Sequence, residues 1–128
     1  MITYLTKQDL IYINQQVLAQ QGTQSQLFSE TGLEGALMRP QTAAYYQNAD
    51  IVTQGALLIA GIALAHAFLD GNKRTALVNG YDFFRINVFT IVSLPLELAQ
   101  QIEMVVNRSQ SLDIVMQDFT DWLRSHIH

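Results

Sequence analysis

The residues best suited to chemistry stand together in the stretch HAFLDGNKRTA, residues 66–76 of a chain of 128 residues. His66 can accept a proton near neutral pH, and Asp70 can bind a divalent cation. Lys73 and Arg74 can bind the oxygens of a phosphate. This combination of a base, a metal ligand and two cations suits phosphoryl transfer, because that reaction depends on positioning and on neutralisation of charge.

The joint Asp70-Gly71-Asn72 is predicted to separate two helices. Gly71 permits a positive φ, so the next helix is expected to begin near Asn72. Lys73 and Arg74 then oppose the dipole of its first turn, unless a bound anion lies among them. The residues alone leave an alternative open, in which a plain turn is followed by solvated cations and the histidine is structural.

The composition excludes several other kinds of site. The chain has no cysteine, which removes disulfides, thiolate metal sites and cysteine nucleophiles. It carries neither a P-loop nor a Rossmann glycine pattern. The net charge of −4 argues against nucleic-acid binding over the whole surface. Four of the seven basic residues are central, which indicates either a small anionic ligand or scattered surface charge; they are Arg39, Lys73, Arg74 and Arg85.

Helices are expected on both sides of the polar cluster. The apolar run 51–67 predicts a buried central helix, and ALVNGYDFFRIN continues helically to about residue 86. GLEGALMRP, residues 32–40, predicts a short helix that Pro40 ends. Residues 41–50 have no clear period and are interpreted as an exposed flap or short hairpin.

The ends of the chain are also predicted to be helical. Thr6 with Asp9 resembles a capping box. The helix that follows ends by Gly22 and buries the apolar residues Leu10, Ile13, Val17 and Leu18. VFTIV, residues 88–92, is expected to be a strand or an extended link.

Two further helices are predicted after this link. Pro95 suits the first turn of one, and Ser111 caps the last one, in which Trp122 is expected to pack in the core. The expectation is a single domain, residues 1–128, folded as an all-α bundle of about six helices.

No membrane segment or export signal is expected. The N-terminus MITYLTKQDL has neither a basic region nor an apolar one, so it does not predict a signal peptide. The apolar run 51–68 is marginal in length and contains Thr53, Gln54 and His66, so it is interpreted as a core helix. Together with the absence of cysteine, this predicts a cytoplasmic protein.

The polar cluster resembles the signature of the Fic/Doc family, in which a histidine, a phenylalanine, an acid and Gly-Asn precede an arginine. YLTKQDLIYIN near the N-terminus and GLEGALMRPQ at 32–41 are similar to segments of its Doc branch, and the resemblance covers most of residues 4–90. It implies that His66 is the general base and that Asp70 holds Mg²⁺. It also implies that Gly71, Asn72, Lys73 and Arg74 bind or support the phosphates of ATP.

The residue between Asn72 and Arg74 divides that family. Members that transfer AMP typically have glycine there, whereas Doc-type members have lysine, as Lys73 is here. The resemblance therefore implies a kinase that transfers the γ-phosphate of ATP. An AMP transferase and a non-catalytic module that binds an anion or a partner are the alternatives.

Doc-type proteins are toxins of toxin–antitoxin modules. The resemblance implies phosphorylation of a threonine of elongation factor Tu, which stops translation, and neutralisation by a helical tail of a Phd-type antitoxin. Tyr45 and Tyr46 would lie in the flap that holds the target, or would anchor that loop to the core.

Three positions depart from the family pattern. Ala67 replaces a frequent proline, and Asn87-Val88 replaces an Asn-Gly turn. Glu34 is not interpreted as part of an inhibitory helix, because Glu30 stands where such a helix has serine or threonine.

Overall fold

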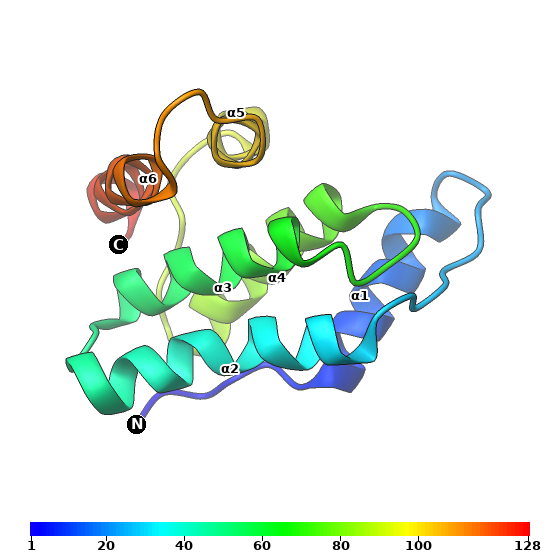
Figure 1. Ribbon diagram of the computed structural model, residues 1–128, viewed down its shortest axis with the longest axis horizontal. Coiled ribbons are helices and arrows are strands. Elements are labelled where there is room, and N and C mark those ends of the chain that lie inside the picture. Colours follow the sequence, from blue (N-terminus) through cyan, green and yellow to red (C-terminus); the bar gives the residue numbers. More distant parts are fainter.

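The computed structural model describes residues 1–128 and contains six helices and no strand. The helices are α1 (Lys7–Ala19), α2 (Glu30–Gln47), α3 (Ile51–Ala65), α4 (Asn72–Ile86), α5 (Pro95–Val106) and α6 (Leu112–His126). Figure 1 shows α3 and α4 at the centre of the bundle, with α2 on one side and α5 and α6 on the other. The prediction of an all-α bundle of about six helices is confirmed.

Helices α3 and α4 form the centre because α3 is apolar almost all round. Gly55 and Gly80 let these two helices pack closely together. A Cβ on Gly55 would lie 2.1 Å from Cζ of Phe84, and one on Gly80 would lie 2.6 Å from Cδ1 of Ile59. This close packing fixes where the N-terminus of α4 lies relative to the C-terminus of α3.

Helix α1 has the capping box that its sequence predicts. Thr6 Oγ1 accepts a hydrogen bond from the Asp9 N–H at 3.2 Å, and Asp9 Oδ2 accepts one from the Thr6 N–H at 2.8 Å. The helix ends at Ala19, and the chain turns through Gly22 at a φ of 70°. Its buried residues are the predicted Leu10, Ile13, Val17 and Leu18, together with Asn14.

The prediction for residues 32–50 was wrong in one respect. Pro40 does not end α2, and residues 41–47 continue the helix rather than forming a flap or hairpin. Pro40 is buried, and Ala43 beyond it is buried too. Packing against α3 offsets the local cost of a proline, about 3 kcal/mol in a helix interior. The helix ends at Gln47, and its C-cap residue Asn48 is left-handed with a φ of 53°.

The segment after α4 is an extended link, the second of the two predicted possibilities. Thr90 and His128 exchange backbone hydrogen bonds of 2.8 and 2.9 Å, and Ile91 pairs with Ile127 in an isolated bridge. Pro95 begins α5 and Ser111 caps α6, as predicted.

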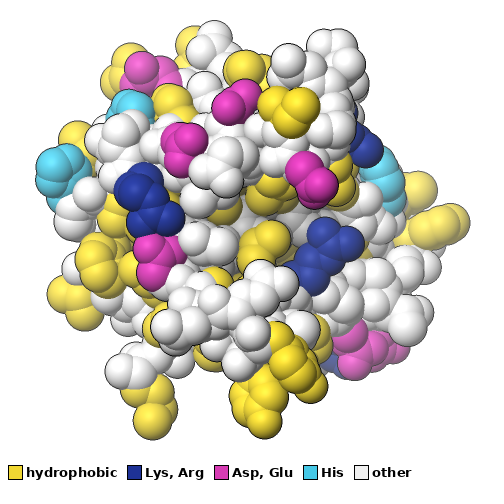
Figure 2. All heavy atoms as spheres, turned by 60° about the vertical axis from the view of Figure 1, so that its left-hand side comes forward, with side chains coloured by type: hydrophobic (Ala, Val, Ile, Leu, Met, Phe, Trp, Pro, Cys, Tyr) yellow, Lys and Arg dark blue, Asp and Glu magenta, His cyan; other side chains and the backbone are white.

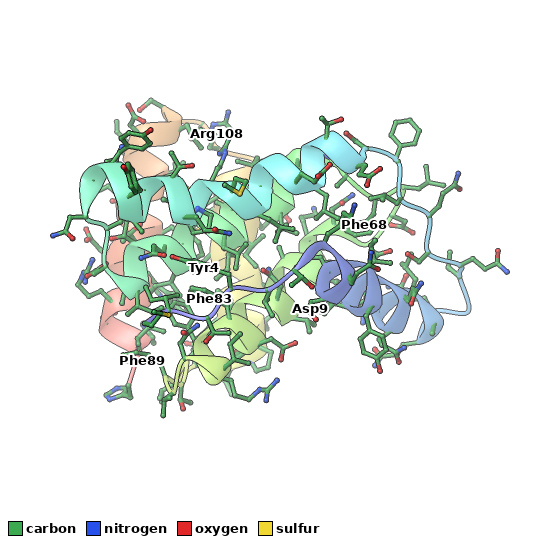
Figure 3. The ribbon with its side chains drawn as sticks, turned by 90° about the horizontal axis from the view of Figure 1, so that it is seen from below. Tyr4, Asp9, Phe68, Phe83, Phe89 and Arg108 are labelled. Atoms are coloured by element: carbon green, nitrogen blue, oxygen red, sulfur yellow. The ribbon has the colours of Figure 1, made fainter.

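Two aromatic contacts join the ends of the chain to this core. Trp122 is half-buried and packs against the core, as predicted. At the other end of the chain, Tyr4 stacks on Phe83 of α4 with ring centroids 6.3 Å apart, as Figure 3 shows.

None of the helices combines the length and the apolar character that a membrane crossing requires. Figure 2 shows one face of the molecule, on which Lys and Arg side chains are scattered among Asp and Glu. No continuous basic area is present on that face.

Candidate active site

The loop between α3 and α4, residues 66–71, carries His66, Asp70 and Gly71 of the polar cluster and lies at the same end of the bundle as the loop between α1 and α2 (Figure 1). His66 caps the C-terminus of α3 in the left-handed conformation, with φ 49° and ψ 40°. A residue other than glycine in this region costs of order 1–3 kcal/mol, and such residues concentrate at functional sites. The strained backbone ends α3 and leaves the His66 side chain exposed.

A neighbouring segment, residues 26–29, holds the first half of this loop. The backbone N–H groups of Phe28 and Ser29 both donate to the carbonyl oxygen of Ala67, at 2.7 and 2.9 Å. The Leu69 N–H donates to the carbonyl oxygen of Gln26 at 3.0 Å. Phe68 is buried at this end of the bundle, in the region between α1 and α2 (Figure 3). The loop is therefore fixed at several backbone positions.

Asn72 closes the second half of the loop. Its Nδ2 donates to the carbonyl oxygen of Phe68 at 2.8 Å, and its Oδ1 accepts from the Phe68 N–H at 3.1 Å. Both ends of the side-chain amide are thus engaged with the loop backbone. Asn72 supports the shape of the site in this structure rather than offering its side chain to a ligand.

Gly71 has the positive φ that its position predicts, 76°. The space around it also requires glycine, since an added Cβ would lie 3.0 Å from Cδ2 of Leu18 and 3.3 Å from Nδ2 of Asn14. No side chain caps the N-terminus of α4 that follows. The first backbone N–H groups of α4 are therefore without a side-chain partner, as an anion-binding helix end requires.

Asn14 of α1 is a supporting residue that the sequence analysis missed. It is fully buried, and its Nδ2 donates to the carbonyl oxygen of Asp70 and to Oγ1 of Thr75, both at 3.0 Å. Its Oδ1 accepts a hydrogen bond from the Ser25 hydroxyl. The available signal was a polar residue on the otherwise apolar face of α1.

A cavity of about 370 Å³ lies over this loop and the first turn of α4. It brings together all six residues predicted for the site, His66, Asp70, Gly71, Asn72, Lys73 and Arg74. The other lining residues are Gln21, Ala63, Leu69 and Val106. Val106 belongs to α5, so one wall of the cavity comes from the C-terminal part of the chain.

The two cations at the cavity have protein partners. Lys73 Nζ pairs with Oε2 of Glu103 at 2.8 Å, and Nη2 of Arg74 donates to Oε1 of Gln20 at 3.4 Å. The other two central cations lie elsewhere. Arg39 lines a separate cavity between α2 and α3, and Arg85 pairs with Asp82. The expected basic centre therefore consists of Lys73 and Arg74.

The sequence was also compared with known families and proteins. The model of the Fic/DOC family matches residues 4–83, more than half of the chain and all of the polar cluster. The chain belongs to the Fic/DOC family. Members of the Fic/DOC family generally transfer nucleotide-derived groups to proteins and typically bind ATP with Mg²⁺. No curated protein matches the chain.

The donor set at this Fic/DOC cavity fits a magnesium ion held jointly with phosphates. Asp70 is the one acidic residue that lines the cavity, and no group of three His, Cys, Asp or Glu side chains is placed to hold a metal by itself. Oδ1 of Asp70 accepts from the Gly71 N–H at 2.7 Å, which orients the carboxylate. Mg²⁺ often takes one or two protein carboxylates and completes its shell with waters and phosphate oxygens.

Proposed function

We propose that this protein is a Doc-type kinase, which transfers the γ-phosphate of ATP to a hydroxyl group of a target protein. The observation that carries the proposal is that His66, Asp70 and Lys73 line one cavity at the uncapped N-terminus of α4. Lys73 occupies the position at which AMP-transferring relatives typically have glycine. Its ammonium adds positive charge where charge gathers during phosphoryl transfer.

The proposed reaction needs one proton acceptor. A neutral His66 imidazole accepts the proton of the target hydroxyl as its oxygen forms a bond to the γ-phosphorus. The bond from that phosphorus to the bridging oxygen of the β-phosphate breaks, and ADP leaves with the electron pair. The exposed position of His66 at the mouth of the site leaves it accessible to a hydroxyl on another protein.

The phosphates would bind at the first turn of α4. Its free backbone N–H groups, Lys73 and Arg74 supply the positive potential. Asp70 would hold Mg²⁺, which neutralises phosphate charge and orients the phosphates when it is bound. Gly71 and Asn72 give the loop the shape that places these groups together.

The proposed target is a threonine of elongation factor Tu, and its modification would arrest translation. A toxin of this kind requires control, and we propose a Phd-type antitoxin whose helical tail binds beside the site. An apolar groove of about 260 Å³ between α1 and α4 supports this. Ile13, Val17 and Leu77 line it, and Arg74 borders both the groove and the phosphate cavity. An amphipathic helix is the partner that suits such a groove.

Expression in growing bacteria tests the proposed function. The wild-type chain is expected to stop growth, and elongation factor Tu recovered from those cells should carry a phosphothreonine. His66→Ala should remove both effects. Growth arrest that survives His66→Ala would contradict a catalytic role. AMP on the recovered factor would instead make the protein an AMP transferase.

A further inference from the structure

Glu103 of α5 contacts the lysine on which the proposed specificity depends. Its Oε2 lies 2.8 Å from Lys73 Nζ, and both side chains are about half exposed, 51% for Lys73 and 48% for Glu103. Glu103 lies outside residues 4–83, the part of the chain that the family model matches. It stands one helical turn before Val106, which lines the phosphate cavity.

The contact is well oriented but is a weak source of stability. The other carboxylate oxygen of Glu103, Oε1, accepts a hydrogen bond from the side chain of Asn107, the C-cap residue of the same helix. Both oxygens are therefore engaged, and the carboxylate has a fixed direction. An exposed lysine–glutamate pair contributes little to the stability of the fold. Because the lysine of the pair lines the phosphate cavity, the contact points to a role in the site instead.

We propose that Glu103 is a positioning residue, which holds the ammonium group of Lys73 at the α5 wall of the phosphate cavity. This inference rests on the proposed kinase function and adds a specificity determinant to it. The ammonium has three N–H donors, and the pair with Glu103 uses one of them. The remaining donors can bind a phosphate without the lysine having to leave its partner.

The benefit of such a partner comes from the flexibility of lysine. A free lysine side chain samples many rotamers, and fixing it before the reaction is worth roughly tenfold in rate. Glu103 also places a negative charge near the phosphates, which opposes the binding of ATP. Glu103 is thus expected to improve the reaction step without improving ATP affinity.

Steady-state kinetics of γ-phosphate transfer to elongation factor Tu can separate an effect on the reaction step from an effect on ATP affinity. Glu103→Ala is expected to lower kcat about tenfold, while KM for ATP stays the same or falls. Glu103→Gln keeps an oxygen that accepts a hydrogen bond and is expected to restore part of kcat. In a Lys73→Met background, Glu103→Ala should change kcat less than twofold, because the side chain that it positions is absent.

The chain offers a matched control. Lys7 and Glu30 form another partly exposed lysine–glutamate pair, and neither residue lines the phosphate cavity. Glu30→Ala should therefore leave kcat and KM unchanged. Thermal unfolding of each variant checks that the fold is intact.

The inference and the proposed function fail in different ways. If wild-type protein transfers the γ-phosphate but Glu103→Ala leaves kcat unchanged or raises it, the positioning role is wrong and the kinase function stands. The positioning role is also wrong if Glu103→Ala lowers kcat by the same factor in the wild-type protein and in the Lys73→Met variant. If wild-type protein transfers no γ-phosphate, the proposed function itself fails, and the inference fails with it.

Discussion

Asn14 of α1 donates a hydrogen bond to the main-chain carbonyl oxygen of Asp70, with its Nδ2 3.0 Å from that oxygen. The same nitrogen donates to Oγ1 of Thr75 in α4, also at 3.0 Å. One buried side chain therefore ties α1 to the loop that carries the proposed metal ligand and to the helix that follows it. The position of Asp70 depends on a residue far away in the sequence.

Asn14→Ala is expected to destabilise the protein and to impair its activity. It leaves the buried hydroxyl of Thr75 and the carbonyl of Asp70 without their donor, which costs about 1–3 kcal/mol. Thermal unfolding should show a lowered Tm, and γ-phosphate transfer should fall more than the loss of folded protein explains. Gln15→Ala, at an exposed position of the same helix, should change neither quantity. Unchanged transfer by folded Asn14→Ala would show that the site does not need this hydrogen bond.

The sequence predicted most of the fold because local signals and packing agree in most helices. The cap at Thr6, the proline at Pro95 and the cap at Ser111 mark helix starts that the structure contains. The boundary at Pro40 was wrong because packing of α2 against α3 outweighs the local preference of proline. A local pattern contains no information about that contact between helices.

The six predicted site residues were found because they lie within nine consecutive positions, so that the loop between α3 and α4 and the first turn of α4 bring them together. The supporting residues could not be found in this way. Asn14 and Glu103 reach the site from α1 and α5, at distances along the chain that no spacing rule covers. The sequence also did not show that the Asn72 side chain binds the loop backbone on both sides.

Gly71→Ala is expected to weaken ATP binding as well as stability. Alanine in the left-handed conformation of this position is strained by about 1–2 kcal/mol. Its Cβ would also press against Leu18. Gly22→Ala is the matched control, because Gly22 has a φ of 70° but open space around it. Both variants should unfold at lower temperature, whereas calorimetric titration with ATP and Mg²⁺ should detect weaker binding only for Gly71→Ala. Equal ATP affinity in the two variants would argue against a phosphate site at this loop.

Asp50→Asn should reduce stability at neutral pH but not in strong acid. The Arg124 guanidinium, with its Nη1 2.6 Å from Oδ2 of Asp50, and the Thr53 N–H lower the pKa of Asp50 from 3.8 to about 2. Because this pKa is depressed in the folded state, the stabilisation is complete above the unfolded-state value of 3.8 and is lost as the pH falls through about 2.

The size of this effect is limited by exposure. Both side chains of the pair are about half exposed, so the loss at neutral pH is expected to be below about 1 kcal/mol. Asparagine can still cap α3, which isolates the ion pair as the cause. Urea unfolding at a series of pH values measures the difference between wild type and Asp50→Asn. A difference that stays constant from neutral pH to pH 2 would contradict the assignment.

Tyr12→Asp should prevent neutralisation by the antitoxin and leave the toxicity of the protein unchanged. Tyr12 is 61% exposed and lines the groove between α1 and α4 that we propose for the antitoxin helix. A carboxylate there opposes burial of an apolar helix face. Coexpression with a Phd-type antitoxin should then fail to restore growth, while toxicity without antitoxin is retained. Tyr45→Asp is the control, since this tyrosine of α2 is 82% exposed and lies outside the groove. Full rescue of Tyr12→Asp by the antitoxin would place the antitoxin elsewhere.

The most direct test of the proposed kinase function is a paired transfer assay. Purified protein is mixed with Mg²⁺, elongation factor Tu and ATP that is labelled either in the γ- or in the α-phosphate. We expect the factor to gain label from γ-labelled ATP alone and expect His66→Ala to abolish the transfer. Label from α-labelled ATP would mean that the protein transfers AMP and that the role given to Lys73 is wrong.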